Sequence, residues 1–189
     1  MNAVFARRMI VMMAVVLGLV TGILPAESGK CPEQTTVSVS SKNGAYDTGI
    51  DWSDIQTVLA IKSSSVGVTS YTVYLANFEF TEATHTEINK LKLAEGQGML
   101  QFTLVNQVEG QKDVIFKSGF YDFSKAQGYA EQTGSVQIRV KNGTSISFSY
   151  HYAEGEFEVI EVTEDTFCGK FILKDKFSQL AGEFAAPVK

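Results

Sequence analysis

The stretch that decides the fold reads GSVQIRVKNGTSISFSYHY and occupies residues 134–152. Apolar and polar residues alternate on both sides of its centre, and a period of two is typical of a β-strand that buries one face. Between the two alternating runs lie Lys141, Asn142 and Gly143, which favour a turn. The stretch therefore predicts an antiparallel β-hairpin.

The alternation also predicts the register of this hairpin. A two-residue turn at Asn142 and Gly143 would place the apolar residues of one strand opposite polar residues of the other. Partners across a hairpin share one face of the sheet. A three-residue loop satisfies this rule beyond its first pair, because it pairs Val140 with Thr144, Ile138 with Ile146 and Val136 with Phe148. We therefore expect a type I turn followed by Gly143 in a left-handed bulge.

The polar residues of the hairpin share its other face, which we expect to point outward. They are Gln137, Arg139, Ser145, Ser147, Ser149 and His151. Short hydroxyl groups around one arginine and one histidine form a flat, donor-rich surface that suits a glycan or another protein, although ordinary solvent exposure explains them equally well. Trp52, in a loop-like context, is a further candidate binding residue that we expect to be exposed. The alternative is that Trp52 plugs one end of the fold.

The rest of the chain reads as short strands separated by Gly, Asn, Asp and Ser clusters. We expect nine or ten strands, at 35–40, 57–62, 70–80, 99–108, 113–123, 134–140, 144–152, 157–162, 167–173 and 180–186. This pattern predicts an all-β antiparallel sandwich, with an up-and-down β-barrel as the alternative. Residues 84–95 predict one short helix, since Thr84 and Glu87 have the spacing of a capping box and Gly96 could end it. An irregular crossover is the alternative there.

Residues 1–26 predict a secretory signal peptide. Arg7 and Arg8 precede an apolar run at 9–24, and Ala26 is a small residue suited to cleavage. The run is just shorter than a membrane span, so a retained anchor is the alternative. We expect residues 27–189 to form one secreted domain, in the periplasm or at the cell surface, without membrane contact after cleavage.

The chain has two cysteines, Cys31 and Cys168. An even count in an exported chain predicts a disulfide, which would join the start of the mature chain to the penultimate strand. Closing so long a loop contributes about 5 kcal/mol in the chain-entropy model. The alternative is two free thiols, with Cys168 packed among apolar neighbours.

Charge and motif content argue against several functions. With 16 Lys and Arg against 21 Asp and Glu, the net charge is −5, which disfavours nucleic acid as a partner. Only His85 and His151 are histidines, and neither His-x-x-x-His nor Cys-x-x-Cys occurs, so we predict no metal and no cofactor. Nor is there a Gly-x-Ser-x-Gly sequence, which leaves a serine hydrolase without support.

Acidic residues gather in two places, of which the first is Asp47, Asp51 and Asp54. This group lacks the spacing of an EF-hand, and a structural calcium site is the lesser alternative to simple solvation. The second group comprises Glu154, Glu156, Glu158, Glu161, Glu164 and Asp165. Because Glu156 and Glu158 alternate with Phe157, this group predicts a solvated strand face.

Four segments, at 71–78, 134–140, 168–173 and 180–184, resemble secreted β-rich bacterial domains of uncharacterised function. Such domains often finish with two Gly-x-Phe strands, which here are 169–171 and 182–184. The resemblance covers most of the mature chain. It implies a fold and a compartment, and it carries no catalytic residues.

We therefore expect an exported, non-catalytic module that acts by binding or as a structural component, with a glycan or a protein as its partner. One alternative is a secreted hydrolase, which would need a cleft with two carboxyl groups about 5 to 9.5 Å apart. Another is a carrier of a small apolar ligand, which would need a closed barrel around an internal cavity.

Overall fold

The computed structural model describes residues 29–41, 50–112, 114–123, 132–141, 145–147, 154–175 and 178–189. The predicted signal peptide lies outside them. Within these residues the chain forms ten strands and one short helix. The elements are β1 (Thr36–Ser41), β2 (Thr57–Ser65), β3 (Val68–Ala76), α1 (His85–Ile88), β4 (Gly98–Gln107), β5 (Gly119–Asp122), β6 (Gln132–Val140), β7 (Ser145–Ser147), β8 (Glu154–Val162), β9 (Thr166–Lys174) and β10 (Ser178–Pro187).

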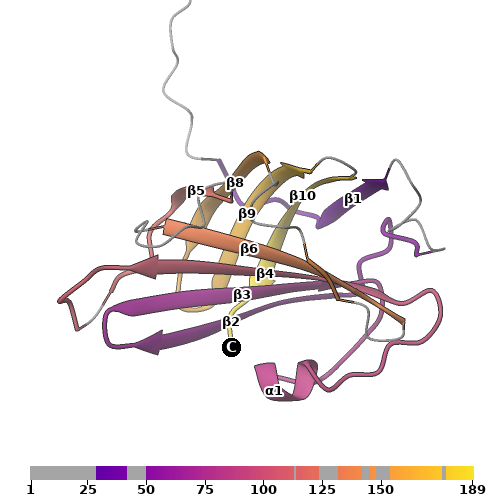
Figure 1. Ribbon diagram of the computed structural model, residues 1–189, viewed down its shortest axis with the longest axis horizontal. Coiled ribbons are helices and arrows are strands. Elements are labelled where there is room, and N and C mark those ends of the chain that lie inside the picture. Colours follow the sequence, from indigo (N-terminus) through magenta and orange to yellow (C-terminus); the bar gives the residue numbers. More distant parts are fainter. Residues whose placement is uncertain are drawn as a thin grey trace, which may run out of the picture.

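The strands follow one hydrogen-bonded path, β1-β10-β9-β8-β5-β6-β4-β3-β2, with β7 paired to β6. Its neighbours are antiparallel except β5 and β6, which meet at a single parallel pair, Asp122 with Thr133. The path folds over at this point, so that β6, β4, β3 and β2 form one layer and β5, β8, β9, β10 and β1 form a second layer across it (Figure 1). The predicted sandwich is confirmed, and the barrel alternative is wrong, since the described strands form no closed barrel.

The last residues of the chain connect the second layer to the edge of the first. Val188 forms a parallel bridge with Ala60 of β2. The backbone N–H of Lys189 donates to Ala60 O at 2.9 Å, and the N–H of Lys62 donates to Lys189 O at 3.2 Å. The chain therefore ends beside β2 (Figure 1), and part of that edge is already paired.

Aromatic rings from both layers fill the space between them. Phe102 of β4 contacts Phe157 of β8 and Phe171 of β9, with ring centroids 5.3 and 4.6 Å apart. Phe167 stacks on Phe184 of β10 at 6.1 Å. All five rings are buried. Alternation along each strand sends them inward, and this packed interior gives no support to a carrier with an internal ligand cavity.

The predicted register of the 134–152 hairpin is confirmed where the structure describes it. Ile138 pairs with Ile146, flanked by Gln137 with Ser147 and Arg139 with Ser145. The turn residues 142–144 lie outside the described residues, as do residues 148–153. The predicted bulge and the positions of Ser149 and His151 therefore stay predictions.

The predicted helix begins where the capping box places it and is shorter than expected. The Thr84 hydroxyl accepts the Glu87 N–H at 3.3 Å and donates to the Glu87 carboxylate at 2.7 Å. The helix ends at Ile88, not near residue 95. Gly96, with φ of 77°, belongs to the turn that precedes β4.

The strand predicted at 113–123 is wrong over most of its length, because β5 covers only Gly119–Asp122. In the preceding segment the carbonyls bind side chains instead of a neighbouring strand. The Thr69 hydroxyl donates to Val114 O at 2.7 Å, and the Asn106 amide donates to Ile115 O at 2.9 Å. The segment is thus held against β3 and β4 with Val114 and Phe116 buried and Ile115 exposed.

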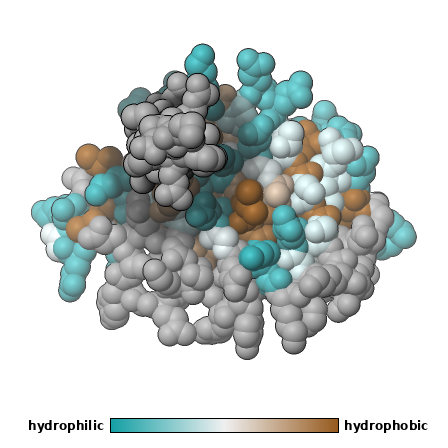
Figure 2. Space-filling view, turned by 90° about the horizontal axis from the view of Figure 1, so that it is seen from above, coloured by the Kyte–Doolittle hydropathy of each residue, from teal (hydrophilic) through white to brown (hydrophobic). Residues whose placement is uncertain are grey.

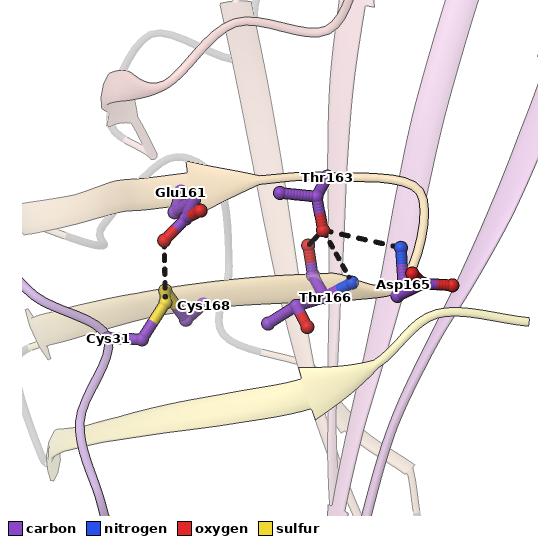
Figure 3. The surroundings of a disulfide bond; sticks show 6 residues. All are labelled: Cys31, Glu161, Thr163, Asp165, Thr166 and Cys168. Atoms are coloured by element: carbon purple, nitrogen blue, oxygen red, sulfur yellow. Dashed lines mark hydrogen bonds between the residues drawn. A yellow bond between two sulfur atoms is a disulfide. The ribbon is translucent and has the colours of Figure 1, made fainter.

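The predicted disulfide is confirmed. Cys31 is bonded to Cys168 of the penultimate strand β9, with their Cα atoms 5.6 Å apart. A carboxylate oxygen of Glu161 on β8 lies 3.3 Å from the Cys31 sulfur (Figure 3). Beyond it, the Thr163 hydroxyl oxygen accepts the Thr166 N–H at 2.9 Å, which closes the turn between β8 and β9.

Candidate functional site

Arg139 of β6 is not the exposed surface residue that the alternation suggested. It lies on the predicted outward face but is covered by the segment around α1. Its guanidinium donates to the carbonyls of Ile88, Asn89 and Leu91, at 2.8, 3.3 and 3.0 Å. These carbonyls lie at the end of α1 and in the turn that follows it, and the carbonyl of Ile88 also accepts the Leu91 N–H at 3.2 Å. Arg139 therefore holds the covering segment in place with three of its five N–H donors.

A second, smaller core lies beneath α1 on the outer face of β2, β3 and β4. It consists of Leu59, Ile61, Tyr74, Ala76, Phe78, Ile88 and Met99. The Tyr74 hydroxyl lies 2.5 Å from His85 Nδ1. Burial raises the pKa of Tyr74 to about 12, although the charge of Arg139 opposes that rise. Burial also lowers the pKa of His85. Both groups are therefore neutral at pH 7 and connect α1 to the sheet.

Trp52 is buried and not exposed as expected, with 7% of its surface accessible. The plug alternative is correct. Its ring packs on Gly98, where an added Cβ would lie 2.8 Å from Trp52 Cη2 and 2.7 Å from Ile50 Cγ2. Trp52 therefore offers no aromatic platform to a sugar.

Of the remaining predicted site residues, the described part of the chain includes Gln137 and the backbone of Ser145 and Ser147. Gln137 is half-buried and lies opposite Gln101 of β4. Ser145 and Ser147 pair with Arg139 and Gln137 through the backbone. The predicted hairpin surface is therefore partly covered by the segment around α1.

A groove of about 780 Å³ lies at one end of the sandwich. Three segments far apart in the sequence form it: the β2–β3 hairpin, the segment with Lys112 and residues 114–116, and the turn between β8 and β9. Its volume is within the range of about 300 to 1,000 Å³ that is usual for ligand sites. We name it the end groove.

Tyr71 and Phe116 form the base of the end groove. Their ring centroids are 4.8 Å apart, and Tyr71 also packs on Phe167 at 4.7 Å. The Tyr71 hydroxyl has no hydrogen-bond partner among the described residues, and burial raises its pKa. It therefore stays protonated and can donate a hydrogen bond to a ligand.

The rim of the end groove combines apolar and cationic side chains. Val66, at the tip of the β2–β3 hairpin, and Ile115 are each 81% exposed. Lys62 and Lys112 line the same groove and form no ion pair with the residues that the structure describes. Glu164 supplies the one carboxylate of the described lining.

A second hollow, of about 340 Å³, lies on the outer face of the other layer. Its apolar side chains are Phe120 of β5, which is 57% exposed, and Ile172 of β9, which is 61% exposed. Carboxylates surround them, namely Glu156, Glu158 and Glu183. Figure 2 looks onto this layer and shows brown apolar side chains among teal hydrophilic ones. We name this surface the acidic face.

The acidic face includes part of the predicted solvated strand. Glu156 and Glu158 alternate along β8 with Phe157 and Val159, which are buried, so the predicted alternation is confirmed. Lys170 of β9 pairs with Glu158 at 2.6 Å. Glu156 and Glu183 form no ion pair within the described residues and leave the face negatively charged.

The described residues hold one group with atoms close enough to share a metal ion: Cys31, Glu161 and Cys168. Its two sulfur atoms are bonded to each other, whereas a metal would need them as thiolates. Asp51 and Asp54 use their carboxylates locally, accepting from Ser53 and Gln56. Asp47, the third member of that predicted cluster, lies outside the described residues.

Sequence reasoning missed both hollows. Ile172 gave a signal, because it is an apolar residue whose place in the alternation of β9 points it outward. Val66 gave another, since it is a valine at the tip of a two-residue turn. The sequence around Ile115 gave no signal that its side chain is exposed, because it predicted a strand at 113–123.

No helix in the described part of the chain is long and apolar enough to span a membrane. Comparison of the chain with protein-family models, with curated proteins and with solved structures finds no match.

Proposed function

We propose that this chain is an exported, non-catalytic binding module that holds its partner in the end groove. The predicted signal peptide and the predicted resemblance to secreted bacterial domains support export, to the periplasm or the cell surface. The disulfide between Cys31 and Cys168 fits the same assignment, because such bonds persist in oxidising compartments.

The observation that carries the binding role is the position of the exposed apolar side chains. Val66, Ile115, Phe120 and Ile172 are the exposed large hydrophobic residues of the described chain, and each lines one of the two hollows. Exposed apolar side chains that gather in a hollow mark interaction sites far more often than scattered ones do. The end groove is the larger of the two hollows, and the Tyr71 hydroxyl in its lining has no hydrogen-bond partner among the described residues.

The lining of the end groove predicts the chemistry of its partner. Val66 and Ile115 can bury apolar side chains, while Lys62 and Lys112 can pair with carboxylates. An acidic, apolar segment of a protein meets both requirements. A neutral glycan would need exposed ring faces to stack on, and Tyr71 and Phe116 are buried at the base.

A peptide titration tests this proposal. The probe is a short peptide of alternating leucine and aspartate, with the leucine and lysine peptide as its charge control, followed by NMR of the backbone amides. We expect saturable shifts at Val66, Ile115 and Tyr71 with the acidic peptide, at a Kd of about 10 µM to 1 mM, as weak interactions give.

Variants make the test specific. The substitution pair Lys62→Ser and Lys112→Ser should weaken binding about tenfold, which corresponds to about 1.4 kcal/mol. The matched control is Lys90→Ser with Lys92→Ser, which removes the same charge from the exposed segment after α1. Equal binding of the two peptides, or shifts confined to other surfaces, would contradict the proposal. Shifts in the groove with neutral oligosaccharides alone would favour a glycan.

A further inference from the structure

We propose that the partner bound in the end groove is a second copy of this chain, which docks there with its acidic face. This inference rests on the proposed function, because it names the partner of the same groove. It makes the protein a self-associating module in which each copy offers its groove to one neighbour and its face to another.

Apolar complementarity is the first argument. Val66 and Ile115 stand at the rim of the end groove with 81% of their surface accessible. Phe120 and Ile172 line a hollow of about 340 Å³ on the acidic face. Placing the hairpin tip and Ile115 against that hollow would cover all four exposed large hydrophobic side chains of the described chain in one contact.

Charge complementarity is the second argument. The end groove carries Lys62 and Lys112 against one carboxylate, Glu164, and the acidic face carries Glu156 and Glu183 beyond the pair formed by Glu158 and Lys170. Opposite charges across an interface favour encounter and fix its register. The same charges count against two acidic faces meeting each other, because carboxylates would then oppose carboxylates.

The two surfaces share no residue, and they lie on different parts of the fold. One copy can therefore use both at once. A contact between two unlike surfaces generates a ring if its rotation closes and an open chain of molecules if it does not. Each contact covers only four exposed apolar side chains, so it should be weak and the assembly should depend on concentration.

Analytical ultracentrifugation of the mature chain with its disulfide intact tests this inference. Over concentrations from about 10 µM to 1 mM, the weight-average mass should rise above that of one copy. Raising the salt concentration from about 0.05 to 0.5 M should reduce that rise, because screening weakens exposed charge pairs. A single mass equal to one copy over the whole range would overturn the inference.

Two variants separate the unlike contact from other kinds of self-association. The groove variant carries Val66→Ser and Ile115→Ser, and the face variant carries Phe120→Ser and Ile172→Ser. Each alone should stay monomeric, because each has lost one of the two surfaces. Their equimolar mixture should form dimers and nothing larger, since one intact groove and one intact face remain between them.

The mixture decides the mode of contact. A mixture that stays monomeric, or a variant that associates as the unmodified chain does, would overturn the head-to-tail arrangement. All four substituted side chains are exposed, so thermal unfolding of each variant should match that of the unmodified chain. The Lys90→Ser and Lys92→Ser variant should associate normally.

The peptide titration, done on the face variant, distinguishes the two proposals. If that variant binds the acidic peptide in its groove while the unmodified chain stays monomeric at every concentration, the proposed function stands and the second-copy inference is wrong. If the groove binds neither the peptide nor a second copy, both are wrong.

Discussion

Replacing Arg139 with alanine should destabilise the protein far more than its place on a polar strand face suggests. The side chain donates three hydrogen bonds to the carbonyls of Ile88, Asn89 and Leu91. Hydrogen bonds from charged groups contribute about 1.5 to 3 kcal/mol each when buried. The carbonyl of exposed Asn89 can bind water instead, so the bonds to Ile88 and Leu91 account for most of the loss.

Two such bonds sum to about 3 to 6 kcal/mol, but Arg139 is only half-buried and water weakens them, so we expect a smaller loss of about 2 to 3 kcal/mol. For a domain of this size that loss lowers the melting temperature by about 4 to 12 °C. Urea unfolding gives the free energy of unfolding directly. Hydrogen exchange should locate the loss at Ile88 and the turn that follows it.

Lys141→Ala is the matched control for Arg139→Ala. Lys141 follows β6 directly and pairs with Glu95 at 2.7 Å, but both side chains are exposed, so its loss should cost less than about 1 kcal/mol. Arg139→Lys should recover part of the stability, since it keeps the charge but loses the fork of donors. If Arg139→Ala changed stability by no more than about 0.5 kcal/mol, as ordinary surface substitutions do, the capping argument would be refuted.

Three further predictions concern the core, the disulfide and pH. Gly98→Ala should destabilise by about 1 to 3 kcal/mol and shift the fluorescence of Trp52, because the added methyl group would lie 2.8 Å from its ring; unchanged fluorescence and stability would contradict this packing. Cys31→Ser with Cys168→Ser should lower the free energy of unfolding by about 2 to 5 kcal/mol in denaturant titration, and no loss would contradict a stabilising bridge. Burial lowers the pKa of His85 in the folded state. As the pH falls, the unfolded chain therefore binds the proton at a higher pH than the folded chain does. Stability should therefore fall as pH drops below about 6.5, its ordinary pKa, and His85→Gln should reduce that dependence; an identical pH profile in this variant would rule His85 out as its source.

Alternation and motif spacing predicted the local features of the fold well. The pairing of Ile138 with Ile146 follows from the period of two together with a short turn at 141–143, since a shift by one residue would mix the faces. The Thr84 cap follows from its spacing to Glu87. These features depend on neighbours in sequence, or on one hairpin, and little else competes with them.

Alternation could not show what covers each face of the sheet. Alternation correctly placed the Arg139 side chain on the face away from the core. The segment around α1 crosses that face, however, and Arg139 donates hydrogen bonds to its carbonyls. Residues 114–116 misled for a similar reason, because Thr69 and Asn106 bind their carbonyls from other strands. The end groove lies among three distant segments, so no local pattern contained it.

The pairing of β1 with β10 has a consequence for the order in which the chain can fold. β1 is the first strand of the described chain and pairs along its whole length with the last strand, from Thr36 with Glu183 to Ser41 with Ser178. A ribosome that has made every strand but β10 leaves β1 with no neighbour in the sheet. Contacts so distant in sequence form slowly, and unpaired strands aggregate. The nascent chain therefore carries β1 without its sheet neighbour until β10 has been made, and a chaperone that shields β1 would act over that interval.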